Sequence, residues 1–320
     1  MKEYIRIQVG EYEYKIPNRW ELITKPYQYQ MLVKDLISMA NGQMSPGMVR
    51  INYICRFFNW NPKKIKDREA YSTLVALSEK VTFFFRISYP DEDEALKGLD
   101  EHSYCLCKRI PPHRLTGLTI ARALAKLDYR FTLNLVFCRQ FIPYVMVNDK
   151  HYSGYTVELS FGSMTTSLTA LQFIEAKQLI GKGDDVLPLM AAILYHPYPY
   201  SSESAHRLAS LPLEELHAIS FNFQAFCNYL FTATQYKLLT MGKETKSVIS
   251  TGALESLYNL SNDGYGDVNC VERMNLLQYL TILRKKTIES VRSLHTSKME
   301  LIDIAKETGF PISIIKKIIL

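Results

Sequence analysis

The stretch Tyr4–Ile16, YIRIQVGEYEYKI, alternates apolar and polar residues on both sides of Gly10. Alternation with a period of two is typical of a strand that turns one face toward a core and the other toward solvent. Gly10 and Glu11 between the two runs favour a tight turn, and Pro17 ends the second run. The sequence therefore predicts a short β-hairpin here.

A second hairpin is expected in the middle of the chain. Ile142–Val147 is apolar, Asn148 and Asp149 favour a turn, and His151–Leu159 is rich in aromatic residues. Gly154, inside the second run, predicts a bulge or a turn. These two hairpins contain all the strands that the sequence predicts.

Helical spacing of apolar residues dominates the rest of the chain. Helices are expected near residues 20–40, 46–58, 69–85, 115–127, 170–180, 184–196, 213–239 and 269–295, with two short helices between 298 and 319. The predicted fold class is therefore α+β, predominantly helical, with two small β-hairpins.

The chain has 320 residues, and at about 150 residues per domain this length predicts two domains. Residues 91–101 hold six acids and one base, and this composition favours a linker. The expected parts are a hairpin with helices at 1–90, an acidic linker at 91–104, a hairpin with a helical domain at 105–268, and C-terminal helices at 269–320 that end in a helix-turn-helix-like hairpin. The division between the two domains is expected near residue 100.

Composition and charge exclude several classes of protein. Hydrophobic residues make up 47% and charged residues 22%, which argues against disordered and collagen-like chains. No apolar run reaches the roughly 20 residues of a membrane helix, and the first residues carry no secretion signal, so no membrane partner is expected. The formal charge of +6 is mild for a dedicated nucleic-acid-binding protein.

Recognisable catalytic and metal-binding patterns are missing from the sequence. It contains no GxxxxGK[ST], HExxH, GxSxG or EF-hand pattern, and its seven histidines are scattered singly. Cys105 and Cys107 are flanked by His102 and His113, but no second cysteine pair stands at zinc-ligand spacing. The sequence thus predicts a protein that is not an enzyme and has no catalytic, cofactor-binding or metal-binding residues. A hydrolase with a site assembled from distant residues is kept as a third interpretation.

The segment Leu301–Ile318 has the spacing of a helix-turn-helix. Such a motif needs a small residue where the helices cross, a glycine at the turn and a buried aliphatic anchor in the second helix. Ala305, Gly309 and Ile315 occupy these places. The candidate nucleic-acid-binding residues are Ser313, Lys316 and Lys317. The alternative is a helical hairpin whose isoleucines pack onto the rest of the chain or onto a neighbouring protein.

Aromatic residues are abundant, with 21 Tyr and 15 Phe. Tyrosine combines apolar area with a polar tip and is enriched at protein interfaces. The tyrosines of the loop at 195–200 and the C-terminal isoleucines are therefore candidates for contact with other subunits. The candidate partner-binding residues are Tyr198, Tyr200, Ile312, Ile315 and Ile318.

Two blocks of the chain carry a resemblance. The first is Ile16–Thr24, IPNRWELIT, followed by Gln28 and Tyr29. The second block consists of Ile142-Pro143, Asn148-Asp149-Lys150, Tyr152-Ser153-Gly154, Leu168-Thr169, Gln172-Phe173, Ala176 and Ala191–Tyr195. These residues resemble uncharacterised structural and assembly proteins of tailed phages and prophages of Bacteroidota.

The resemblance implies a role in the virion or in its assembly, and it carries over no catalytic residue. The expected function is that of a non-enzymatic phage virion or assembly protein: a tail, neck or capsid-associated component, or an assembly chaperone. Its expected partners are other protein subunits, copies of itself among them, in the cytoplasm of the bacterial host or in the virion. The alternative function is DNA binding through the helix-turn-helix-like segment.

Overall fold

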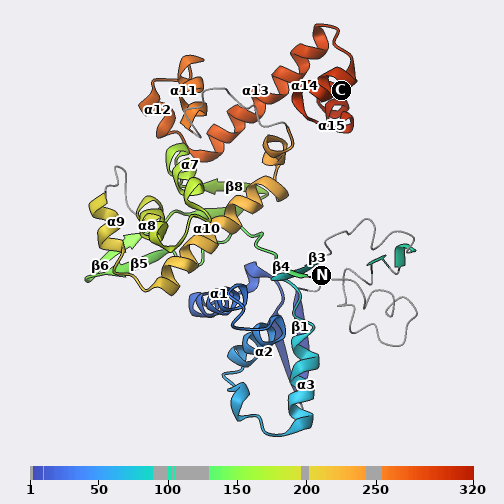
Figure 1. Cartoon of the computed structure of the whole chain (residues 1–320), viewed down its shortest axis with the longest axis vertical. Helices are drawn as coiled ribbons and strands as arrows, with labels where there is room; N and C mark the ends of the chain where they lie inside the picture. The colour runs from blue at the N-terminus through green and yellow to red at the C-terminus, as the bar shows by residue number, and fades with distance from the viewer. Residues whose placement is uncertain are drawn as a thin grey trace. The chain divides into compact units, whose positions relative to one another are not determined.

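The computed structural model describes residues 3–9, 11–88, 100–102, 104–105, 130–195, 202–242 and 254–320 (Figure 1). Helices dominate this part of the chain, and its strands form four two-stranded antiparallel sheets. The predicted fold class, α+β and predominantly helical, is confirmed. The chain divides into two compact units, residues 1–135 and 136–320, and each is described here by itself.

The first unit opens with the predicted hairpin. Strand β1 (Tyr4–Val9) pairs with β2 (Tyr12–Pro17), and Ile5 lies opposite Ile16. Both isoleucines are buried, so the apolar face of the alternating pattern does lie against the core of the unit.

The helix expected from residue 20 begins later. A short 3-10 helix, η1 (Trp20–Leu22), comes first, and α1 (Pro26–Ala40) starts with its proline at the first helical position. A residue that precedes proline avoids the helical region, so Lys25 is extended and separates the two helices.

Two further helices complete the first unit. Helix α2 (Pro46–Phe57) starts after Ser45, whose Oγ accepts from the backbone N–H of Met48 at 3.3 Å. The short turn η2 (Pro62–Lys64) leads to α3 (Arg68–Ser78).

The aromatic run after α3 does not extend the helix to residue 85 as expected. Phe83 and Phe84 are buried, and the ring of Phe83 lies edge-on to Trp20 at 5.0 Å. The chain then forms strand β3 (Phe85–Ser88), which pairs with β4 (Arg130–Leu133). These strands were missed because three consecutive phenylalanines show no period of two.

Because β3 and β4 pair, Ser88 and Arg130 lie opposite each other in the first unit. The units divide at 135/136 and not near residue 100. Most of the expected linker at 91–104, and the whole of the expected helix at 115–127, lie outside the described residues.

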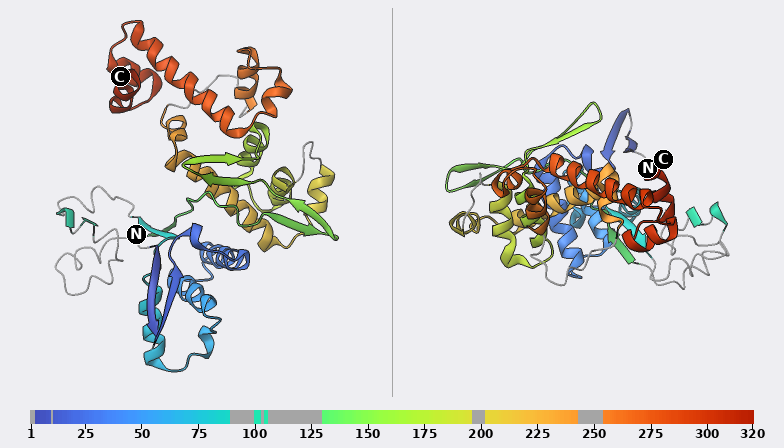
Figure 2. Two further views of the ribbon diagram at one scale, coloured as in Figure 1. Left: turned by 180° about the vertical axis from the view of Figure 1, so that it is seen from behind. Right: turned by 90° about the horizontal axis from the view of Figure 1, so that it is seen from above.

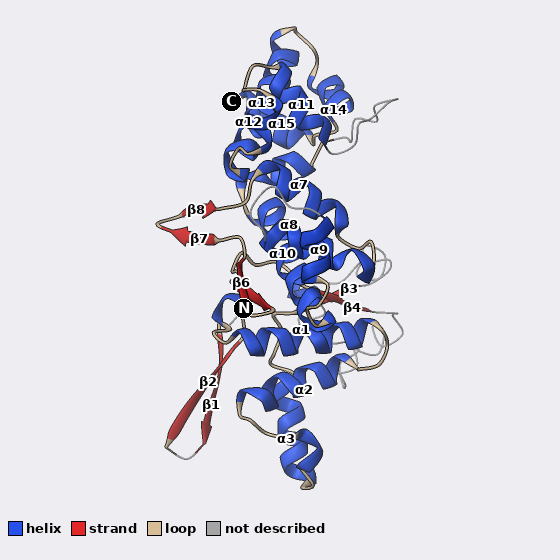
Figure 3. Ribbon diagram, turned by 90° about the vertical axis from the view of Figure 1, so that its left-hand side faces the viewer, coloured by secondary structure: helices blue, strands red, loops and turns tan. Residues whose placement is uncertain are grey.

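The second unit carries two hairpins. Strand β5 (Tyr144–Val147) pairs with β6 (Lys150–Ser153) around the predicted Asn148–Asp149 turn. The expected continuation of the second strand to Leu159 is instead a separate hairpin, β7 (Val157–Ser160) and β8 (Ser163–Thr166). Figure 3 shows β7 and β8 projecting from the helices around them.

The hairpins are followed by the helices of the second unit. They are α7 (Ala170–Leu179), η4 (Asp184–Val186), α8 (Leu187–Tyr195), α9 (Ser202–Leu208), α10 (Leu213–Ala233), η5 (Gln235–Thr240), α11 (Glu255–Asn262), α12 (Val268–Glu272), α13 (Leu276–Thr296), α14 (Leu301–Thr308) and α15 (Ile312–Ile319). Figure 2 shows the long α13 leading into the C-terminal helices, all drawn in red.

Several residues of the second resemblance block form hydrogen bonds within this unit. Thr169 and Gln172 form a reciprocal capping box at the start of α7, and the Gln172 amide donates to the carbonyl of Ile193 in α8 at 3.0 Å. The N–H of Gly154 donates to the carbonyl of Pro143 at 2.8 Å. These residues therefore have structural roles.

One predicted helix, 269–295, is divided in two. Between α12 and α13, the Met274 carbonyl accepts from the N–H of Ala170, and the Asn275 amide donates to the Thr166 carbonyl at 2.7 Å. These contacts hold the backbone in an extended bridge opposite Thr169, so the helix cannot run through.

Candidate functional site

The β7–β8 hairpin ends in a two-residue turn with an unusual first residue. Ser160 pairs with Ser163, which leaves Phe161 and Gly162 in the turn with φ of 47° and 78°. Two-residue hairpin turns of this kind need positive φ at both central positions, and Asn, Asp and Gly are the residues that adopt it most easily. A bulky aromatic residue in this conformation is an outlier.

The neighbouring hairpin in the chain gives a direct comparison. The β5–β6 turn has Asn148 and Asp149 at φ of 49° and 60°, so it uses residues suited to the left-handed region. At Phe161 the same conformation costs on the order of 1 kcal/mol. The ring is also fully exposed, so the chain gains no burial of this side chain in return.

Further apolar side chains lie exposed on the same two hairpins. The strands alternate: Val145 and Val147 are buried, whereas Tyr144 and Met146 are about half exposed. The Tyr144 ring stacks on His151 with centroids 4.6 Å apart. The four exposed apolar residues, which we call the hairpin residues, are Tyr144, Met146, Leu159 and Phe161.

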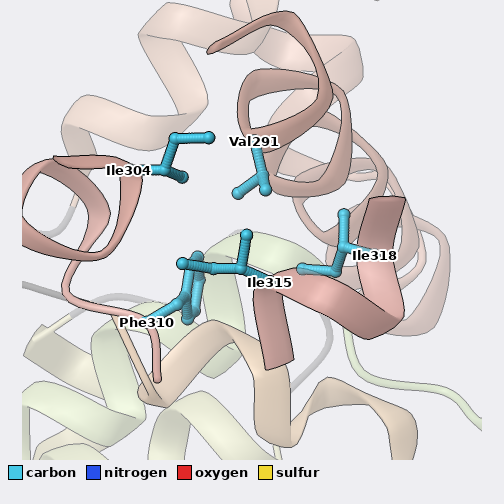
Figure 4. Packing of buried hydrophobic residues seen from close by; sticks show 5 residues of the cluster. All are labelled: Val291, Ile304, Phe310, Ile315 and Ile318. Carbon is cyan, nitrogen blue, oxygen red and sulfur yellow. The ribbon is translucent and has the colours of Figure 1, made fainter. Parts of the chain in front are cut away.

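The C-terminal candidates separate into a buried and an exposed set. Ile315 and Ile318 pack with Val291, Ile304 and Phe310 in a closed apolar cluster (Figure 4). The expectation that Ile315 and Ile318 contact a partner is therefore corrected, because their side chains are buried within the chain.

The remaining candidate contact residues are Ile312 and two loop tyrosines. Ile312, on the outer side of α15, is 39% exposed and keeps its place as a candidate contact. The loop tyrosines Tyr198 and Tyr200 lie outside the described residues.

The segment with helix-turn-helix spacing forms two short helices, α14 and α15, which pack against α13. Gly309 takes a left-handed conformation at φ 75°, and its N–H donates to the carbonyl of Ala305 at 2.9 Å. Ile304 in α14 and Ile315 in α15 are buried against α13, and Ala305 packs beside them. Ser313, Lys316 and Lys317 are exposed, and α15 contains no acidic residue.

The titratable groups with shifted pKa values are explained by local packing. Burial raises the pKa of Glu175, and the nearby Glu272 charge raises it further. The pKa of Asp267 is lowered, first by the backbone N–H of Cys270, which donates to this N-cap of α12 at 2.7 Å. Within the described residues, no three His, Cys, Asp or Glu side chains gather at a distance suited to a metal ion.

Among the described helices, none combines the length and the apolar character that crossing a membrane requires.

The hairpin residues were missed by sequence reasoning. The signal was present in residues 157–166, VELSFGSMTT, where a glycine follows an aromatic residue between two short strands. A Phe-Gly pair is a weaker turn signal than Asn-Gly or Asp-Gly, so the second strand was expected to end at Leu159.

Comparison with known proteins adds no relative: no family model matches the chain, no curated protein matches its sequence, and no solved structure matches its fold.

Proposed function

We propose that the protein is a non-enzymatic assembly component of a tailed phage that works through protein–protein contacts made by its hairpins. The observation that carries the proposal is Phe161: a fully exposed aromatic ring held in a strained turn conformation. In the free chain, both the exposure of this ring to water and its backbone conformation are unfavourable. Such a residue is expected where the side chain becomes buried in a partner.

The other hairpin residues support the same role. Exposed apolar area on the two hairpins is also contributed by Tyr144, Met146 and Leu159. Each hairpin is a two-stranded sheet, and the outer edge of such a sheet can accept a further strand. Exposed apolar side chains are a common property of interaction sites. The phage context rests on the resemblance of the two sequence blocks. The partners are other subunits of the particle or of its assembly pathway, with a second copy of this chain included.

The test uses Phe161→Asn, because Asn-Gly is the preferred sequence for this turn and the hairpin is retained. The full chain is co-expressed with the products of the adjacent genes, and the complexes are measured by sedimentation, with the chain alone as a second sample. We expect association that Phe161→Asn weakens at least about tenfold, as for an interface hot spot. The exposed Tyr27→Ala in the first unit is the control and leaves association unchanged.

A monomer that binds none of these proteins, or a complex that Phe161→Asn leaves unaltered, would overturn the proposal.

A second candidate function is binding of duplex DNA by the C-terminal helices. The observation that favours it is the left-handed Gly309 between α14 and α15, together with the exposed Ser313, Lys316 and Lys317. The outer face of α15 has no Arg, Asn or Gln to read base edges, so binding would be to phosphates and weakly sequence-specific.

The test for this second function is a titration of random duplex DNA at several salt concentrations. Lys316→Gln/Lys317→Gln should lower the affinity and reduce the slope of log affinity against log salt by about one for each phosphate that is no longer neutralised. Absence of binding at low salt would exclude this function.

A further inference from the structure

The end of helix α2 fixes the position of an exposed tryptophan in the first unit. Asn59 takes the left-handed conformation at φ 55°, and the N–H of Trp60 donates to the carbonyl of Cys55 at 2.7 Å. This six-to-one hydrogen bond is that of a Schellman turn with Asn in the usual place of Gly. The backbone of Trp60 is therefore held by the helix that precedes it.

Several aromatic rings meet at this turn. The rings of Phe58 and Trp60 are stacked, with centroids 4.5 Å apart and planes at 18°. Tyr14 of the β1–β2 hairpin lies edge-on to Phe58 at 5.3 Å. Phe58 is half-buried, whereas Trp60 is 50% exposed. We call Tyr14, Phe58 and Trp60 the aromatic platform.

Positive charge follows the platform directly in the chain. Lys63, Lys64 and Lys66 are all exposed, and the turn that carries the first two is fixed by the Asn61 side chain, which accepts from the N–H of Lys63 at 3.0 Å. Within the described residues, none of the three lysines makes an ion pair.

The nearest acid in sequence, Asp67, is engaged elsewhere. Its two carboxylate oxygens accept from the N–H groups of Glu69 and Ala70 at the start of α3, at 3.2 and 3.1 Å. Its carboxylate therefore caps α3 and forms no ion pair with any of the three lysines.

We infer that the aromatic platform and these lysines bind single-stranded nucleic acid. A base stacks on the exposed face of Trp60, and the lysines contact the phosphates that flank it. Stacking on aromatic rings combined with backbone neutralisation is the general mode of binding single strands, and it tolerates any base because every base has a π-face. This site is made of other residues than the hairpin residues and α15, and it does not depend on the proposed function.

The two tryptophans of the chain make a direct measurement possible. Trp20 is buried and its Nε1–H donates to the Asn134 carbonyl at 2.8 Å, so quenching by an oligonucleotide reports on Trp60. The full chain is titrated with single-stranded oligothymidine of about 12 nucleotides at low salt. Saturable quenching of the emission is expected, with an affinity that falls as salt rises.

Variants are measured by anisotropy of a labelled oligonucleotide, which needs no tryptophan. Trp60→Ala is expected to weaken binding at least about tenfold. Lys63→Gln/Lys64→Gln is expected to weaken it and to flatten its salt dependence. The matched controls are Tyr27→Ala for the ring and Lys182→Gln/Lys237→Gln for the charge, since these two lysines are exposed and lie outside both candidate nucleic-acid sites, and both variants should bind like the unchanged protein.

Three outcomes would overturn the inference: no binding to single-stranded DNA or RNA at low salt, binding that neither Trp60→Ala nor Lys63→Gln/Lys64→Gln weakens, or equal quenching of Trp60 by a duplex of the same length, whose bases are not available for stacking. Thermal unfolding of each variant, followed by circular dichroism, verifies that it is folded.

Discussion

Gly154 lies against the ring of Tyr195 so closely that a Cβ at this glycine would stand 2.7 Å from Cε1 of the tyrosine. Tyr195 is buried, and its hydroxyl donates to the carbonyl of Ile142 at the start of the β5 hairpin. The sequence predicts a bulge or a turn at this glycine. The structure gives a different reason: strand β6 ends at Ser153, and the small residue makes room for the ring.

Gly154→Ala is therefore expected to destabilise the protein by about 1–3 kcal/mol, because the ring or the backbone must shift. The measurement is urea unfolding followed by circular dichroism. The control is Gly47→Ala in α2, where a Cβ meets nothing within 4 Å and alanine favours the helix. If Gly154→Ala unfolds at the same urea concentration as the unchanged chain, the contact is not as described.

Phe161→Asn should leave the stability unchanged or raise it by up to about 1 kcal/mol, since asparagine adopts positive φ more readily than phenylalanine. The reciprocal change, Asn148→Phe in the other two-residue turn, should lower the stability by a similar amount. Thermal unfolding of the two variants measures both effects. A loss of stability in Phe161→Asn would mean that the ring packs within the chain.

Ile315→Ala should destabilise the C-terminal helices by about 2–5 kcal/mol, because it empties the centre of the cluster formed with Ile304 and Phe310. Ile312→Ala, on the same helix but exposed, is the control and should cost less than about 1 kcal/mol. Hydrogen exchange of the amides in α14 and α15 shows whether only these helices unfold or the whole protein is destabilised. Equal effects of the two substitutions would contradict the burial assigned to Ile315.

The pH dependence of stability should include a contribution from Glu175, which lies on α7 near Glu272. Its folded-state pKa is raised by burial and by that second carboxylate, so the folded state holds its proton more tightly than the unfolded chain does. Stability due to this group is full below the ordinary glutamate pKa and is lost as pH rises through the folded pKa. Glu175→Gln should therefore stabilise the protein at neutral pH.

The free energy of unfolding should also fall less in Glu175→Gln than in the unchanged protein as the pH rises from acidic to neutral. Urea unfolding midpoints from pH 4 upward provide the measurement, with the exposed Glu158→Gln as the control. A stability that falls equally with pH in both variants would show that Glu175 does not titrate in this way.

The sequence correctly predicts those helices and strands that are determined by neighbouring residues in the chain. The β1–β2 hairpin follows from strict alternation and α7 from the helical spacing of its apolar residues, and both are confirmed. The division between α12 and α13 could not be predicted, because it depends on contacts of Met274 and Asn275 with residues about a hundred positions earlier.

The candidate site was only partly predictable for the same reason. Helical periodicity places the C-terminal isoleucines on an apolar face, but it does not say whether α13 or another protein covers that face. The structure answers this for Ile315 and Ile318, and it leaves Ile312 exposed. Phe161 stands out because its φ is positive. Phenylalanine rarely adopts positive φ, so the sequence gives no reason to expect this conformation.

The pairing of Ser88 with Arg130 at the far end of the β3–β4 ladder has an engineering consequence. Cross-strand partners can be joined by a tight turn of two residues, so the forty-odd residues between them can be exchanged for Asn-Gly without stretching either strand. This junction is therefore a natural splice point, at which an unrelated sequence can be inserted or a shortened chain made while the β3–β4 pairing is retained.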